Sequence, residues 1–294
     1  MATSSATSAT MTTVYRPRKR FPVAQVLRYV ALTFLAFLFV TPLIWMFSTS
    51  FKTTSQAYRF PPEFIPSPLI FDSYTNLWTG SIPFNEFYLN TTVIVIFSEI
   101  GTLFSCTLAA YAFARLHWIG RNVWFGVLLA TMMLPFQVIM IPVYIIFRQL
   151  GWLDSWLPLI VPTFLGNPFY IFLLRQFFLG LPRDLEDAAR VDGAGSLRIL
   201  WQIFIPLSKP VLLTVVMFTF VGAWNDFLGP LLYLTSIDKM TVSVGLSMFI
   251  GRAGATNWPN MMAGATLALL PILVMFLLFQ KYFVKGIALT GLKG

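Results

Sequence analysis

Charged residues are scarce in this sequence: Asp, Glu, Lys and Arg together make up 11% of its 294 residues, whereas 57% are hydrophobic. A soluble globular domain carries about 25% charged residues. The composition therefore excludes a soluble globular protein and predicts a membrane protein. The length allows one membrane domain of several helices and leaves little for a separate soluble domain.

Cysteine and histidine are almost absent. Cys106 is the only cysteine and His117 the only histidine, so an intrachain disulfide and a histidine-rich zinc site are both excluded. Cys106 lies in an apolar stretch, where we expect it to be a small packing residue. The sequence also has no Gly-x-x-x-x-Gly-Lys-Ser/Thr phosphate-binding loop. It offers no Ser/His/Asp set, metal cluster or paired carboxylates within one span, which argues against a membrane enzyme.

Long apolar runs recur along the chain instead. A helix needs about 20 apolar residues to cross the hydrocarbon core of a bilayer. Six stretches qualify, near residues 26–48, 89–114, 123–147, 156–178, 210–234 and 261–280. We therefore expect an all-α membrane protein with about six transmembrane helices. It would consist of a disordered basic N-terminus over 1–25, a membrane domain over 26–281 and a tail over 282–294.

Proline occurs within most of these stretches. The prolines concerned are Pro42, Pro135, Pro142, Pro158, Pro162, Pro168, Pro230 and Pro271. Membrane helices tolerate proline when neighbouring groups satisfy the freed carbonyl. Ordinary kinks explain each proline singly, and the set favours bent helices that line a pathway over a straight bundle.

Basic residues predict the orientation. If the N-terminus is cytoplasmic, most Lys and Arg fall in inner segments, namely the N-terminal tail, the turn near 115–122, the loop over 181–209 and the C-terminal tail. This positive-inside distribution predicts that both termini are cytoplasmic. It also explains the formal net charge of +9 without nucleic acid. The apolar run after the N-terminal cluster is too long for a signal peptide, so we expect an uncleaved first helix.

The loop between the fourth and fifth stretches has a helix–turn–helix pattern. Asp184 is a natural N-cap, with Asp187 three residues later as in a capping box, and Gly193 suits a left-handed helix end. A second short amphipathic helix follows from about Ser196 to Pro206. From the residues alone, the first helix is either a solvated loop helix without a partner or a narrow, alanine-bearing helix that enters a groove on another protein.

The spacing within this loop is specific. Asp187-Ala188-Ala189 is followed after three residues by Gly193, and after nine more by Ile203, which comes shortly before Ile205-Pro206. This arrangement resembles the EAA loop of ATP-binding cassette (ABC) importer permeases, whose pattern has Glu-Ala-Ala, Gly, Ile and Leu-Pro at the same spacing. Asp for Glu and Ile for Leu are conservative departures.

Further segments agree with this resemblance. The run from Leu185 to Ala194, the Ala223-Trp-Asn-Asp-Phe-Leu228 segment and the tail from Gln280 to Gly294 are similar to the carbohydrate-uptake branch. From about residue 20 to its end, the chain resembles the smaller, six-span permease of maltose-type systems. The resemblance implies a type I ABC importer permease fold that carries a sugar or oligosaccharide.

The resemblance also implies roles for particular residues. In the family, the EAA loop forms a coupling helix that docks onto the ATPase. The corresponding residues are Glu186, Asp187, Ala188, Ala189, Gly193, Ala194, Ile203 and Pro206. The family's C-terminal tail also contacts the ATPase, which here corresponds to Gly291, Leu292, Lys293 and Gly294. No catalytic residue, metal or cofactor is expected on this chain, because ATP and Mg would bind the partner ATPase.

The implied partners are a second homologous permease, two copies of the ATPase, an extracytoplasmic solute-binding protein, the sugar and membrane lipid. The implied location is a bacterial or archaeal plasma membrane. The cargo could instead be glycerol phosphate, an amino acid, phosphate or a metal. An ion-coupled secondary transporter is a further alternative, although such folds usually show paired repeats with interrupted helices, and no convincing repeat is visible here.

Two carboxylates fall within the predicted spans. A charge at the bilayer centre costs roughly 2.5–3.5 kcal/mol on insertion scales, so each should face water or a partner. Trp224, Asn225 and Asp226 together could stack on and hydrogen-bond a sugar in the pathway. Alternatively, Asp226 pairs with a neighbouring helix or caps a broken turn. Glu99 is the other pathway candidate, and its alternative is a hydrogen bond to a neighbouring helix.

Overall fold

The structure is a computed structural model that describes residues 23–250 and 256–291. Within these two ranges the chain is helical and contains no strand, as the predicted all-α class requires. The predicted disordered N-terminus lies outside the described residues up to residue 22. Residues 23–25 already belong to the first helix, α1 (Val23–Thr49).

The chain divides into two units between Trp45 and Met46. Within the described residues, four helical segments are long and apolar enough to cross a membrane: Gln25–Thr49, Phe84–Arg115, Leu157–Leu179 and Trp258–Gln280. Two further candidates are pairs of shorter helices joined at a sharp bend, which gives up to six spans if each pair counts as one. The described residues therefore agree with the predicted six-span architecture.

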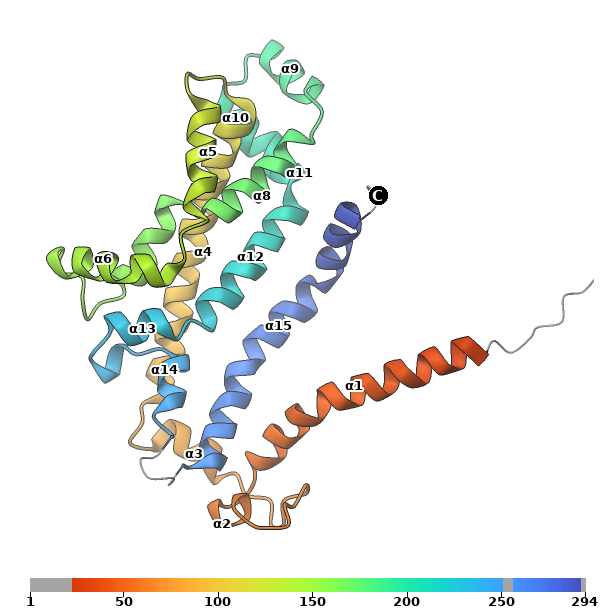
Figure 1. The fold of residues 1–294 in the computed structure, drawn as a ribbon, viewed down its shortest axis with the longest axis vertical. Helices are drawn as coiled ribbons and strands as arrows, with labels where there is room; N and C mark the ends of the chain where they lie inside the picture. The colour runs from red at the N-terminus through yellow and green to blue at the C-terminus, as the bar shows by residue number, and fades with distance from the viewer. Residues whose placement is uncertain (1–22, 251–255, 292–294) are drawn as a thin grey trace, which may run out of the picture. The chain divides into compact units, whose positions relative to one another are not determined.

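Three helices organise the second unit. In Figure 1, α12 (Lys209–Trp224) lies between α4 (Phe84–Arg115) and α15 (Trp258–Gly291) and packs against both. The helix α8 (Pro168–Leu179) packs along α4. The unit also contains shorter elements, among them α2 (Thr54–Ala57), α3 (Asp72–Thr79), the 3₁₀ helix η3 (Ile237–Lys239) and α14 (Val242–Ser247).

The third predicted span, 123–147, is not a single straight helix. It consists of α5 (Arg121–Thr131) and α6 (Phe136–Gln149), which meet at a bend of 100°. Pro135 precedes α6 and lacks the N–H that would continue the α5 ladder, so the chain turns there. With 11 and 14 residues, the two helices are only about 17 and 21 Å long, and neither crosses a bilayer alone.

The fifth predicted span, 210–234, is also interrupted. The helix α12 ends at Trp224, and a separate short helix, α13 (Leu228–Tyr233), follows. Asn225 and Asp226 stand at the break, and both are poor helix formers that compete for backbone hydrogen bonds. The prediction of one continuous helix over 210–234 was therefore wrong beyond Trp224.

The N-terminal end of α12 joins the loop that precedes it. That loop contains α10 (Ser196–Ile199), a π-helical turn η2 (Leu200–Phe204) and α11 (Ile205–Leu207). The segment Ser196–Leu207 meets α12 at 81°, which makes the second bent pair. The predicted second helix of the loop is thus present, with one π turn inside it.

The fourth span is built from three consecutive pieces. They are α7 (Leu157–Ile160), the 3₁₀ helix η1 (Val161–Leu165) and α8. Gly166 has a positive φ of 93°, which favours glycine, and Asn167 then caps α8 by accepting hydrogen bonds from two backbone N–H groups.

Two apolar cores lie at opposite ends of α4. The core near Arg115 gathers Tyr111, Phe178 and Phe204, whose rings pack edge to face. The core near the start of α4 gathers Phe84 and Phe87 with side chains from α3, α14 and α15. The loop with the EAA-like spacing therefore packs on the first core, through the ring of Phe204.

Candidate functional site

The predicted first helix of the loop is present as α9 (Asp184–Val191), at the top of Figure 1. Its first turn carries Asp184, Glu186 and Asp187, and its last turn carries Arg190, which suits the helix dipole at both ends. The capping prediction for Asp184 was wrong. Asp184 is the first helical residue, Arg183 occupies the N-cap position, and no side chain caps the helix there. Asp184 therefore acts only through its charge.

The predicted helix end at Gly193 is confirmed. Gly193 has a φ of 76°, and its N–H donates to the carbonyl of Arg190 at 3.0 Å. The N–H of Ala194 donates to the carbonyl of Ala189 at 2.9 Å. This pair of bonds is a Schellman motif, which satisfies carbonyls that the helix leaves free and fixes the direction of the chain after α9.

The helix α9 has two different faces. Asp187, Ala188 and Val191 are exposed, and Val191 is 88% exposed. Glu186 is only 7% exposed, and Ala189 is half-buried against the core near Arg115. One face is thus anchored to the chain, and the other presents a carboxylate and small apolar groups to an outside partner.

The remaining predicted coupling residues divide in the same way. Ala194 and Ile203 are half-buried and pack on the core near Arg115. Pro206 and Gly193 are exposed. The structure therefore brings the predicted set into one continuous loop surface with a packed inner side.

Arg115 anchors the loop from the body of the protein. It is the last residue of α4 and is only 6% exposed. Its Nη2 donates to the carbonyl oxygens of Phe178 at 2.5 Å and Leu181 at 2.6 Å, just where α8 ends. Its Nη1 lies 3.9 Å from Oε2 of Glu186, and its guanidinium lies 4.9 Å from the centre of the Phe204 ring.

Glu186 completes this network with a second arginine. Nη2 of Arg190 donates to Oε1 of Glu186 at 2.7 Å. This hydrogen bond and the charge of Glu186 raise the pKa of Arg190. We name Arg115, Glu186 and Arg190 the loop anchor. Sequence reasoning missed Arg115, because an arginine after an apolar span is ordinary and nothing in the sequence shows which carbonyls it reaches.

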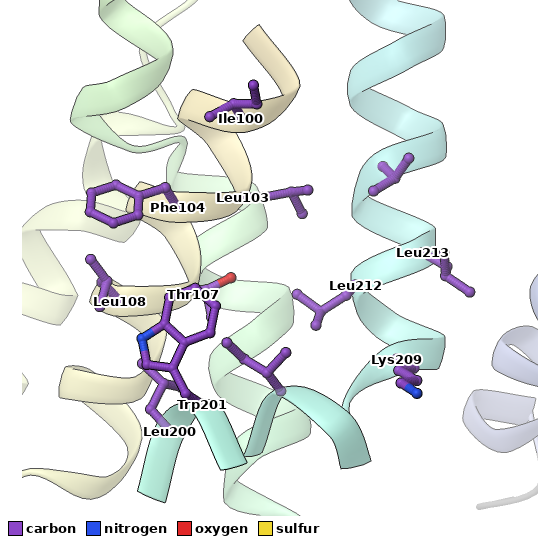
Figure 2. Close-up of a pocket in the computed structure, with 12 residues that line it drawn as sticks. Ile100, Leu103, Phe104, Thr107, Leu108, Leu200, Trp201, Lys209, Leu212 and Leu213 are labelled. Carbon is purple, nitrogen blue, oxygen red and sulfur yellow. The ribbon is translucent and has the colours of Figure 1, made fainter. Parts of the chain in front are cut away.

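An apolar groove lies beside the same loop. It has a volume of about 640 Å³ and runs between α4 and α12, with η2 and α11 at one end. Figure 2 shows Leu103, Thr107, Trp201 and Leu212 around it, with Lys209 at the foot of α12. Of the described residues that line the groove, Lys209 alone is charged.

The predicted pathway residues of the fifth span are engaged within the chain. Trp224 is 3% exposed, and its Nε1 donates to the carbonyl of Ala268 at 2.9 Å. Oδ1 of Asp226 accepts from the N–H of Gly229 at 3.1 Å in the first turn of α13. Asn225 donates back to the carbonyl of Val221 at 2.9 Å. The capping alternative for Asp226 thus describes its contacts, and Trp224 packs inward rather than presenting its ring to a ligand.

Glu99 differs from these residues. Both of its carboxylate oxygens are buried and have no hydrogen-bond partner among the described residues. The alternative, a hydrogen bond to a neighbouring helix, is therefore not formed within the described residues. Glu99 lies close enough to Tyr170 of α8 for an electrostatic interaction. It remains the pathway candidate with free hydrogen-bonding capacity.

The predicted tail contact is described only at its first residue. Gly291 ends α15, and Leu292, Lys293 and Gly294 lie outside the described residues. Across the described part of the chain, no group of three or more His, Cys, Asp or Glu side chains is arranged to hold a metal ion.

A helical membrane body with bent spans, and with an anchored helix–turn–helix between its fourth and fifth spans, is the architecture of a permease subunit of a transporter. The comparisons agree. Residues 101–289 match the family described as binding-protein-dependent transport system inner membrane component, and the chain belongs to that family.

Relatives and a solved structure extend this likeness over nearly the whole chain. The arabinooligosaccharides transport system permease protein AraQ of Bacillus subtilis (strain 168) is 33% identical over 281 residues, which cover 95% of this chain and 99% of AraQ. The sn-glycerol-3-phosphate transport system permease protein UgpE of Yersinia pestis is 34% identical over 256 residues, covering 85% of this chain and 91% of UgpE.

A chain in the crystal structure of a bacterial ABC transporter involved in the import of the acidic polysaccharide alginate has a TM-score of 0.80 at 26% identity. The match covers 92% of this chain and 100% of that chain. The protein is thus a multi-pass inner-membrane permease of a binding-protein-dependent ABC transporter.

Proposed function

We propose that this chain is the smaller permease subunit of an ATP-driven importer for a sugar or oligosaccharide, and that α9 is its coupling helix. The observation that carries the proposal is the two-faced structure of α9. Asp187 and Ala188 are exposed for docking, while Glu186 and Ala189 hold the helix to the permease. Docked on an ATPase, α9 would move when the ATPase closes, and the permease would alternate between inward- and outward-facing states.

The proposal requires partners that this chain does not contain. The sequence has no phosphate-binding loop, so ATP and Mg would bind two copies of a separate ATPase. A second homologous permease would complete the membrane pathway, and an extracytoplasmic binding protein would deliver the solute. Docking of α9 on the ATPase would place the loop and both termini in the cytoplasm, in agreement with the positive-inside distribution. The tail from Gly291 onward would touch the ATPase.

Sugar import is favoured by the names of the relatives. AraQ belongs to an arabinooligosaccharide system, and the structural neighbour to an alginate importer. The second candidate cargo is sn-glycerol 3-phosphate, because UgpE is as similar in sequence. An arabinooligosaccharide is neutral and the phosphate ester is anionic, so a binding protein for the phosphate ester needs cationic groups that a neutral sugar does not require.

The first experiment identifies the partners and the cargo. The chain is purified from its native host in mild detergent, and the bound proteins are identified by mass spectrometry. Recovery of a second permease and a P-loop ATPase, near one to one to two, supports the importer. The co-purifying binding protein is then assayed by calorimetry with oligosaccharides and sn-glycerol 3-phosphate. Recovery of the chain alone, active in proteoliposomes with an ion gradient, would overturn the proposal.

Charge reversal at the exposed face of α9 tests docking directly. Asp187→Arg should abolish uptake and release the ATPase during purification, because the face that meets the ATPase changes sign. Membrane insertion should stay normal, since Asp187 is exposed. Asp192→Arg, an equally exposed change just after α9, is the matched control and should keep the ATPase bound. If Asp187→Arg takes up solute at the wild-type rate, α9 does not dock on the ATPase in the way proposed.

A further inference from the structure

Arg115 is only 6% exposed, although it is charged and stands at the end of α4. A buried charge is stable only when hydrogen bonds and an opposite charge replace the lost water. The two carbonyls that it reaches, those of Phe178 and Leu181, stand where α8 ends and no further helical turn supplies i+4 N–H donors. Arg115 therefore closes the end of α8 from a neighbouring helix.

The same guanidinium faces the loop on its other side. Nη1 lies 3.9 Å from Glu186, which is itself buried and belongs to α9, and the guanidinium lies over Phe204 of η2. One side chain of α4 thus contacts the end of α8, the loop helix α9 and the second half of the loop. No other arginine among the described residues makes all three of these contacts.

We propose that Arg115 is a positioning residue that transmits the movement of α9 to α4 and α8. This inference rests on the proposed function, in which α9 docks on the ATPase. If α9 moved away without α4, Glu186 would keep its bond to Arg190, but the buried Arg115 would lose its ion-pair partner. The separated state is unfavourable, so α4 and α8 follow α9. The contact with Phe204 makes the second half of the loop move with them.

A purely structural cap would behave differently. If Arg115 only stabilised the end of α8, its replacement would lower the amount of folded protein and leave the solute carried per ATP unchanged. If it transmits movement, the assembled transporter continues to hydrolyse ATP but carries less solute for each ATP. The ratio of uptake to hydrolysis separates these two roles.

The test compares Arg115→Gln, Arg115→Lys and Glu186→Gln with Arg198→Gln as the matched control. Arg198 lies in the same loop, is exposed and, among the described residues, bonds Gln202 alone, at 3.0 Å. Each assembled complex is reconstituted with its binding protein, and uptake of the solute identified from that protein is measured with ATP hydrolysis.

Arg115→Gln and Glu186→Gln should lower uptake per ATP by about 5- to 150-fold, the usual range for coupling between sites. Arg115→Lys should recover part of the ratio, since it keeps the charge but not the planar fork that reaches both carbonyls. Arg198→Gln should match the wild type. A wild-type ratio in both Arg115→Gln and Glu186→Gln overturns the proposal. If Arg115→Gln does not assemble, Glu186→Gln decides alone, because it leaves the bonds to α8 in place.

A second measurement needs no ATPase. Nitroxide labels on Val191→Cys, at the end of α9, and Ile119→Cys, in the turn after α4, report their separation by double electron–electron resonance in the purified chain. Both sites are exposed, and Cys106 is fully buried and stays unlabelled. The distance distribution should broaden in Arg115→Gln and Glu186→Gln. Unchanged widths of the distance distribution would refute the proposal that Arg115 and Glu186 hold α9 in place. If the wild-type chain binds no ATPase, the proposed function itself is wrong, whatever the widths.

Discussion

Replacing Gly193 by alanine should loosen α9 through backbone strain alone. Gly193 has a φ of 76°, and no atom of the described residues lies within 4 Å of the position that a Cβ would take. An L-residue in the left-handed region costs about 1–2 kcal/mol. Alanine also restricts the unfolded chain, which offsets about 0.4–1 kcal/mol. The net loss is about 1 kcal/mol, or about fivefold in the local opening equilibrium.

Hydrogen–deuterium exchange measures this opening. The amide of Ala194, which closes the Schellman motif, and the amides of α9 should exchange about fivefold faster in Gly193→Ala. Gly193→Asn should fall between alanine and the wild type, since asparagine tolerates the left-handed region. Gly195→Ala is the matched control, because Gly195 has a φ of −72° and equally open surroundings. Equal exchange in Gly193→Ala and Gly195→Ala would refute the strain argument.

Three other changes test the described contacts. Trp224→Phe removes the hydrogen bond to the carbonyl of Ala268 and should cost about 0.5–1.5 kcal/mol, seen as a lower melting temperature in detergent; an unchanged melting temperature would contradict the bond. Hydrogen bonds from Ser236, and the ion pair with Lys239, lower the pKa of Asp154. The stabilisation is therefore complete above the unfolded pKa of about 3.9 and is lost as the pH falls further, so Asp154→Asn should flatten the acid side of a stability–pH curve. Glu99→Gln should leave the melting temperature unchanged or higher, because no bond is lost; if uptake also stays at the wild-type level, Glu99 has no place in the pathway.

Much of the loop could be predicted from the sequence. The α9 helix, its end at Gly193 and the second helix after Ser196 follow from local rules about charge, glycine and amphipathic spacing. Such rules depend on residues close together in the chain, and they place α9 correctly. The N-cap was misplaced by one residue because Asp184 suits both the N-cap and the first turn, and its sequence neighbours do not distinguish them.

The bends of the chain and the contacts between distant segments could not be predicted from such local rules. Hydropathy measures how apolar a stretch is, and the stretch around Pro135 is as apolar as a straight span would be. Its 100° bend depends on whether neighbouring helices satisfy the freed carbonyls, which is a tertiary matter. The partners of Arg115 and the hydrogen bond of Trp224 to Ala268 join segments that are distant in the sequence, so no local pattern predicts them.

Among the candidate spans in the described ranges, α4 alone contains no proline. It runs for 32 residues, or about 48 Å, without a break. A helix with an unbroken hydrogen-bond ladder resists bending, whereas the other spans carry proline sites where they can flex. A displacement applied at Arg115 would therefore reach Phe84, at the far end, with little loss. Within the second unit, α4 would therefore move as one rigid body, and the proline-bearing helices of that unit would bend to accommodate its movement.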